Sequence, residues 1–179
     1  MTHHSSRAEA WLLPLLFIIV SAGSTFAFAC ITPFAAFAVV AAYALPTRMA
    51  LLTVIGVWLA NQAVGFGYLH YPLDLNTALW GIAIGGAALL STVGARTAMS
   101  RSGHNFVPAL GAGLVVAFGV YEVALYLVSF GLGGQDGFSA SIIGYFALLN
   151  LAWTVGLVAV VETLRRTRAI GVDLARSVP

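Results

Sequence analysis

The residues best suited to chemistry in this sequence are polar side chains inside long apolar segments. Glu122 lies in FGVYEVALYLVSF, and Asn61, Gln62 and Asn150 interrupt two other apolar runs. An ionisable or amide side chain in such a segment costs free energy unless it finds a partner. These residues therefore indicate either a hydrogen-bond network between helices or a binding site.

Aromatic side chains accompany these polar groups at helical spacing, which places them on shared helix faces. The three faces hold Trp58, Asn61, Gln62 and Gly65; Glu122, Tyr126 and Ser129; and Phe146, Asn150 and Trp153. Small-molecule sites are mostly apolar cavities with a few hydrogen-bonding groups. The convergence of three such faces favours a ligand pocket. The alternative is that Glu122 pairs with Asn150 or Asn61 in a structural network.

The segments that hold these residues are predicted to be membrane-spanning helices. Of the 179 residues, 60% are hydrophobic and 8% are charged, whereas a soluble domain has about 25% charged residues. The mean hydropathy is +0.96. We therefore expect an all-α integral membrane protein, multi-pass, in the inner membrane of a bacterium. A helix needs about 20 apolar residues to cross the hydrocarbon core. The expected spans are residues 11–30, 31–45, 49–69, 77–98, 107–132 and 141–163.

The basic residues orient these six spans. All eight are arginines, and every second connecting segment, counted from the N-terminus, contains them: Arg7, Arg48, Arg96, Arg101, Arg165, Arg166, Arg168 and Arg176. The segments between hold Asp74 and Asp136 and no arginine. Positively charged flanks stay in the cytoplasm. Both termini are thus predicted to be cytoplasmic, with 1–10 as an N-terminal segment, 11–163 as one transmembrane domain and 164–179 as a basic tail.

The stretch from Tyr68 to Asp74 is then at the outer surface. Tyr68 and His70 are candidate contacts at the rim of a pocket. Tyr71 and Asp74 also fit an interfacial aromatic belt followed by a turn. A neutral imidazole can bind a metal or a ligand's hydrogen-bond donor. His70 and the single cysteine, Cys30, are the metal candidates near the predicted pocket, although a lone cysteine is more typical of apolar packing.

Several function classes lack their motifs. The sequence has no P-loop, no HExxH and no acid pair, and we expect neither an enzyme nor a cofactor. The pI near 9.0 reflects the arginines of the loops. Nucleic acid is therefore not an expected partner.

Two stretches resemble a known family. TPFAAFAVVAAYALPTRMAL, after the first span, and SAGSTFAFA, within it, are similar to motifs of the substrate-binding S-components of energy-coupling factor (ECF) vitamin transporters. Those proteins are of similar length, with six helices and both ends cytoplasmic. Their first helix presents an Ala-x-x-x-Ala surface, for which this chain has Gly23 with Ala27 and Ser21 with Thr25.

The resemblance implies an outward-open pocket formed by the fourth to sixth helices and capped by outer loops. Its ligand would be a vitamin such as biotin, thiamin, riboflavin or cobalamin, or, in a neighbouring group, a cobalt or nickel ion. The implied partners are an ECF-type transmembrane coupling protein and ATPases, or none in a solitary cobalamin-type member. One such lineage ligates the cobalt of the corrin through a cysteine, but no motif aligns Cys30 or His70 with that role.

The sequence thus predicts an S-component-like uptake protein that binds a small molecule on its outer face. The candidate ligand contacts are Trp58, Asn61, Gln62, Tyr68, His70, Glu122, Tyr126, Asn150 and Trp153. One alternative is a structural or assembly subunit of a larger membrane complex, with Glu122 pairing across an interface on the exterior of the bundle. A second alternative is a cobalt or nickel uptake component.

Overall fold

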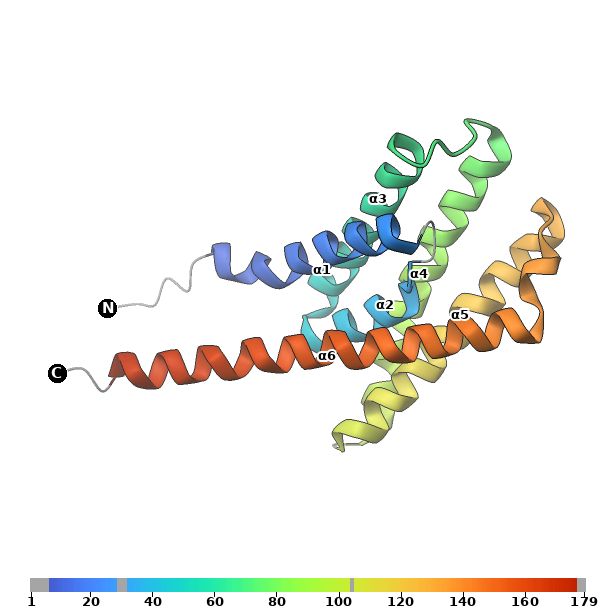
Figure 1. Cartoon of the computed structure of the whole chain (residues 1–179). Helices are drawn as coiled ribbons and strands as arrows, with labels where there is room; N and C mark the ends of the chain where they lie inside the picture. The colour runs from blue at the N-terminus through green and yellow to red at the C-terminus, as the bar shows by residue number, and fades with distance from the viewer. Residues whose placement is uncertain (1–6, 29–31, 104, 177–179) are drawn as a thin grey trace.

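A computed structural model describes residues 7–28, 32–103 and 105–176, and the regular elements in these ranges are helices (Figure 1). They are α1 (Arg7–Phe28), α2 (Phe34–Ala44), α3 (Thr47–Gly67), α4 (Leu75–Arg101), α5 (Phe106–Leu132), the 3₁₀ helix η1 (Gln135–Phe138) and α6 (Ala140–Arg176). The prediction of an all-α fold is confirmed for this part of the chain. The start of α1 and the end of α6 lie at the same end of the molecule (Figure 1).

The short helix α2 forms the centre of the bundle. It contacts α3, α4, α5 and α6, and each residue from Phe34 to Ala42 is at most 5% exposed. A helix that is apolar all round is stable only when its whole surface is buried. Phe37 packs against Phe17 of α1, with ring centroids 6.0 Å apart.

Two prolines set the limits of α2. Pro33 stands at its N-cap position, and Leu45 at its end has an extended backbone (φ −125°, ψ 152°). Leu45 precedes Pro46, and the residue before a proline is disfavoured in the helical region. The chain can therefore turn between α2 and α3 within two residues.

Among the described residues, four helices are long and apolar enough to cross a membrane: Thr47–Gly67, Leu75–Arg101, Phe106–Leu132 and Ala140–Thr167. In α1, the described apolar stretch is shorter and runs over Trp11–Phe26. The expected span 31–45 becomes the 11 residues of α2. At 1.5 Å per residue they cover about 16 Å, roughly half of a hydrocarbon core of about 30 Å. This segment is a helix enclosed by protein.

Other boundaries also differ from those expected. α4 extends beyond the expected 77–98 at both ends and starts at Leu75, because Asp74 caps its first turn. α6 continues as a helix to Arg176, so the segment after residue 163, expected to be a tail, prolongs the last helix.

Small residues let α3 and α4 approach closely. A Cβ atom on Gly85 would lie 2.8 Å from the indole of Trp58, and one on Gly81 would lie 2.7 Å from Oε1 of Gln62. Neighbouring Gly86 faces open space. Gly85 is thus required for packing, because the indole ring cannot move aside easily, whereas the flexible end of Gln62 could move away from a Cβ at position 81.

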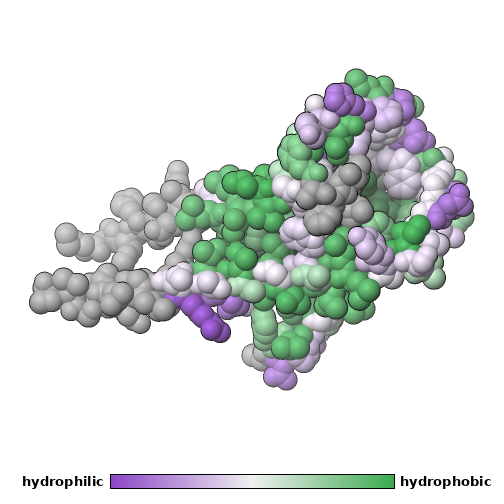
Figure 2. All heavy atoms as spheres, in the orientation of Figure 1, coloured by the Kyte–Doolittle hydropathy of each residue, from purple (hydrophilic) through white to green (hydrophobic). Residues whose placement is uncertain are grey.

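Large apolar side chains cover much of the visible surface, and the most hydrophilic residues form small groups towards the edges of the view (Figure 2). Ile82 of α4 is 65% exposed and Val115 of α5 is 72% exposed. Such extensive exposed apolar surface is unfavourable in water and suits hydrocarbon.

Candidate ligand cavity

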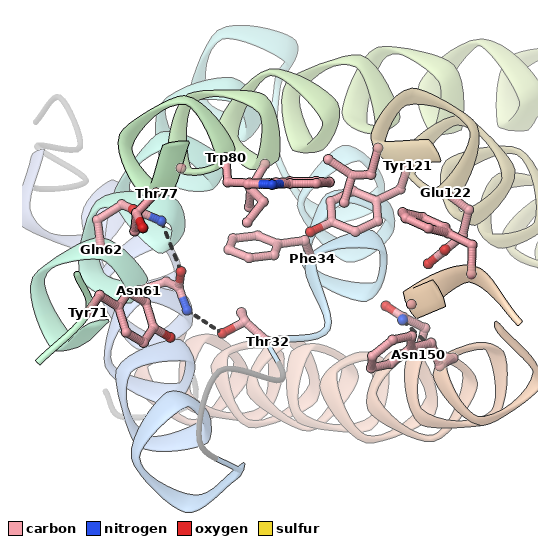
Figure 3. A pocket seen from close by; sticks show the side chains of 16 residues that line it. Thr32, Phe34, Asn61, Gln62, Tyr71, Thr77, Trp80, Tyr121, Glu122 and Asn150 are labelled. Carbon is pink, nitrogen blue, oxygen red and sulfur yellow. Dashed lines mark hydrogen bonds between the residues drawn. The ribbon is translucent and has the colours of Figure 1, made fainter. Parts of the chain in front are cut away.

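A cavity of about 290 Å³ lies where six helical elements and two non-helical segments converge, and Figure 3 shows its lining side chains. The lining residues come from the segment just before α2, the start of α2, the end of α3, the loop that follows, the start of α4, the middle of α5, η1 and α6. They are Thr32, Phe34, Asn61, Gln62, Tyr71, Thr77, Trp80, Gly81, Ile84, Tyr121, Glu122, Leu125, Gly137, Phe138, Phe146 and Asn150. The volume is at the lower end of the range for small-molecule sites, about 300–1,000 Å³.

Amide and hydroxyl groups occupy one side of the cavity. Nδ2 of Asn61 donates to Oγ1 of Thr32 at 2.9 Å, and Nε2 of Gln62 donates to Oδ1 of Asn61 at 3.1 Å. Asn61 is only 4% exposed and also donates to Thr25 of α1 at 3.4 Å. Asn61 therefore joins α3 to α1 and to the segment before α2, whereas Gln62 extends this network to the cavity surface.

The other side holds Asn150 and Glu122 (Figure 3). Oδ1 of Asn150 accepts a hydrogen bond from the backbone N–H of Ala36 at 2.9 Å, and its Nδ2 donates to the carbonyl of Phe146 at 2.9 Å. Asn150 thus supplies the N-terminal cap that α2 lacks in its own sequence, since Pro33 has no side-chain acceptor. The asparagine has a structural role as well as a place in the lining.

Glu122 takes no part in that network. Among the residues that the structure describes, its carboxyl group has no hydrogen-bond or ion-pair partner. The alternative in which Glu122 pairs with Asn61 or Asn150 is therefore not what the structure shows. Its carboxyl group instead borders the cavity.

Aromatic rings lie between the two polar sides. Phe34 and Tyr121 stack with ring centroids 6.0 Å apart and an interplanar angle of 24°, and Trp80 lies beside them (Figure 3). Phe138 and Phe146 complete the aromatic lining. The cavity thus has an amide side, an aromatic middle and an acidic side.

A capping interaction positions the α4 residues of the lining. Oδ1 of Asp74 accepts a hydrogen bond from the backbone N–H of Thr77 at 2.8 Å, as an N-cap aspartate does. This bond lowers the pKa of the Asp74 carboxyl below its usual value. Nδ2 of Asn76 donates to the carbonyl of Leu132 at 3.0 Å, which fixes the start of α4 against the end of α5. Thr77 and Trp80 are thereby held towards the cavity.

Five predicted contacts lie elsewhere. Trp58 donates its indole N–H to the carbonyl of Gly81 at 2.8 Å and packs in the interface between α3 and α4. Trp153 packs against Phe37 and lines a separate apolar groove with residues of α1. Each tryptophan lies about one helical turn from a polar residue that lines the cavity. The sequence therefore predicted which residues share a helix face, but not the position along that face at which the cavity lies.

The other three are at the surface. Tyr68 is 62% exposed and contacts Phe26 edge to face. Tyr126 is 42% exposed and packs against Phe138, behind the lining. His70 is exposed and has a positive φ of 56°, a turn conformation that histidine adopts more readily than most residues.

The sequence analysis did not single out Trp80, Thr77, Phe34 or Tyr121. A signal for the first two was present: Thr77, Trp80, Gly81 and Ile84 follow helical spacing from the Asp74 cap. Phe34 and Tyr121 had no distinguishing signal, because both read as ordinary apolar positions of their helices.

Within the described ranges, no three residues among His, Cys, Asp and Glu gather closely enough to hold a metal ion. Cys30 lies outside those ranges, and His70 stands alone. Comparison of the chain with protein-family models, with curated proteins and with solved structures gave no match.

Proposed function

We propose that this protein is a multi-pass protein of a bacterial inner membrane that binds a small molecule in the cavity and takes it up. The observation that carries the proposal is the convergence of Gln62, Glu122 and Asn150, from three different helices, on one cavity. Binding requires no covalent step: the ligand enters from outside, the outer loops close, and the ligand is released inward.

The placement of the arginines supports an outward orientation. Arg48 is at the start of α3 and Arg101 is at the end of α4, whereas the lining residues come from the end of α3 and the start of α4. The cavity therefore lies at the opposite end of the bundle from the arginines. With arginines held in the cytoplasm, we propose that both termini are cytoplasmic and that the chain makes six passes, of which the short, enclosed helix α2 forms the second; the common end of α1 and α6 supports this orientation (Figure 1).

The lining favours an organic ligand of one or two small rings. About 290 Å³ is too little space for a corrin, so cobalamin fits poorly. The described lining has one carboxyl group and neither histidine nor cysteine, which is a poor donor set for cobalt or nickel.

The assembly-subunit alternative expects Glu122 on the exterior of the bundle. The position of Glu122 at the cavity favours ligand binding instead. An S-component-like protein, solitary or with a coupling protein and ATPases, fits these features.

The proposal is tested by native mass spectrometry of the protein purified in lipid nanodiscs, followed by uptake of the co-purified compound into proteoliposomes or cells. Ile84 lines the cavity, so we expect Ile84→Trp to abolish co-purification and uptake. Ile82 of the same helix is 65% exposed, and Ile82→Trp should change neither. Equal retention of the compound by both variants would show that the cavity is not the binding site.

Orientation is tested by cysteine labelling from outside, in a Cys30→Ser background. We expect reagents to reach a cysteine at position 74 or 136 and not one at 48, 101 or 166. The reverse pattern would overturn the topology.

A further inference from the structure

The charges of the cavity are unbalanced. Of its lining side chains, Glu122 is the one carboxyl group, the phenols of Tyr71 and Tyr121 are the other ionisable groups, and none is basic. The side chains of Arg96 and Arg165 form their hydrogen bonds at the C-terminal end of α2, whereas the cavity lies at its N-terminal end. No described residue therefore neutralises Glu122.

A carboxylate in this position is costly, since charges inside a protein are normally paired. A cationic ligand would supply the missing partner and gain a charge-assisted hydrogen bond. The aromatic wall has the same preference, because the faces of Trp, Tyr and Phe rings attract cations. Phe34, Trp80 and Tyr121 also present flat ring surfaces to the cavity, between its amide side and Glu122 (Figure 3).

The opposite side of the cavity suits a neutral group. Within the described part of the chain, the side chain of Gln62 makes a single hydrogen bond, through Nε2 to Asn61. A primary amide has two donors and an acceptor with two lone pairs. Gln62 therefore keeps hydrogen-bonding capacity for a ligand, whereas Asn61 and Asn150 already use theirs within the protein.

Resting on the proposed function, we propose that the ligand is a planar organic cation. Its charged nitrogen group pairs with Glu122, its flat body lies against Phe34, Trp80 and Tyr121, and a neutral hydrogen-bonding group at its other end meets Gln62.

An anionic ligand is the opposite possibility, because the N-terminus of α2 carries partial positive charge. The N–H groups there are largely occupied: Ala36 donates to Asn150, and Phe37 donates to the carbonyl of Pro33 at 3.2 Å. Glu122 would repel an anion in the same space. The cavity therefore favours a cation.

Three probes of nearly equal size and shape test the charge: benzamidinium, benzamide and benzoate. Each is titrated into the full-length protein in nanodiscs near neutral pH, with calorimetry as the readout. We expect benzamidinium to bind about tenfold more tightly than benzamide, and benzoate to bind most weakly. Glu122→Gln should weaken benzamidinium binding by about tenfold and leave the affinity for benzamide unchanged within about twofold.

Two further variants make the result specific to Glu122. Glu122→Asp keeps the charge and should retain the preference for benzamidinium over benzamide. Glu162→Gln removes a carboxylate that pairs with Arg165 outside the cavity, and should leave all three affinities unchanged.

The proposal is overturned if benzamide or benzoate binds as tightly as benzamidinium, if Glu122→Gln leaves benzamidinium binding intact, or if benzamidinium does not bind. These outcomes leave uptake untouched, because the co-purification and Ile84→Trp experiments assume nothing about ligand charge. Conversely, a protein that binds benzamidinium through Glu122 but transports no compound would keep this inference and lose the uptake proposal.

Discussion

The two ends of the buried helix α2 meet different surroundings. At its C-terminal end, Nη2 of Arg96 donates to the carbonyl of Ala42 at 2.8 Å and also to that of Leu45. Tyr43 donates to Glu162 at 2.7 Å and accepts from Arg165 at 2.8 Å. At its N-terminal end, Phe34 borders an open cavity that also holds an unpaired carboxyl group.

The difference separates polar groups that hold the fold from those that remain available. At the arginine end, charged side chains satisfy the last carbonyls of a buried helix, which have no partner within the helix itself. One buried nitrogen there, Nε of Arg96, lacks a partner among the described residues, so the arrangement has a cost. At the cavity end, Asn150 has the equivalent capping role and Glu122 has none. A polar group without a structural role, placed beside empty volume, is the feature expected of a binding site.

The largest expected effect on stability comes from removing the Arg96 side chain at the C-terminal end of α2. Arg96→Leu removes both bonds to the carbonyls of α2, and we expect the free energy of unfolding to fall by about 3 kcal/mol, measured by thermal unfolding in one detergent. Arg101→Leu, in the exposed last turn of α4, is the control and should cost less than about 0.5 kcal/mol. Equal losses would mean that Arg96 does not cap α2.

The packing of α3 on α4, which supports one side of the cavity, is tested by adjacent glycines. Gly85→Ala forces a Cβ against Trp58 and should cost about 2 kcal/mol. Gly86→Ala points into open space and should stabilise the helix by up to about 1 kcal/mol. Thermal unfolding measures both variants, and we expect Gly85→Ala to be less stable than the wild type and Gly86→Ala to be at least as stable. Two variants of equal stability would contradict the contact.

The contribution of Glu122 to the stability of the fold is tested in ligand-free protein. Because Glu122 has no partner among the described residues, we expect Glu122→Gln to leave the free energy of unfolding unchanged or to raise it by about 1 kcal/mol. The measurement is thermal unfolding of ligand-free protein. A clear loss of stability would assign Glu122 to the structural class, together with Asn150.

The smallest effect concerns the α4 cap at the cavity mouth. The bond from Thr77 lowers the pKa of Asp74 in the folded protein, so its carboxylate contributes stability above its unfolded pKa, about 3.9. That contribution is lost as the pH falls through the lower, folded pKa. The Asp74→Ala variant should therefore have a slightly lower melting temperature than the wild type at neutral pH. This difference in melting temperature should disappear in acid. A difference in melting temperature that stays constant over this pH range would show that the Asp74 cap does not cause it.

The sequence supported a good part of this site. Asn61, Gln62, Glu122 and Asn150 stood out because polar groups are rare in apolar helices, and all four line the cavity. Trp58 and Trp153 were selected by the same helical spacing and proved to be packing residues. Spacing along a helix shows which residues share a face, but it does not show how far along that face a neighbouring helix closes the gap.

By itself, the sequence determined what depends on composition and local chemistry: the helical fold of the described residues, the exposed apolar surface, and the position of the arginines near the ends of the apolar segments. Only the tertiary structure decided that α2 is enclosed by four helices, that Asn150 caps it, and that Glu122 is left without a partner beside a cavity. The reason is physical. Backbone preferences act within a few residues, whereas burial and pairing depend on which faces of distant helices meet.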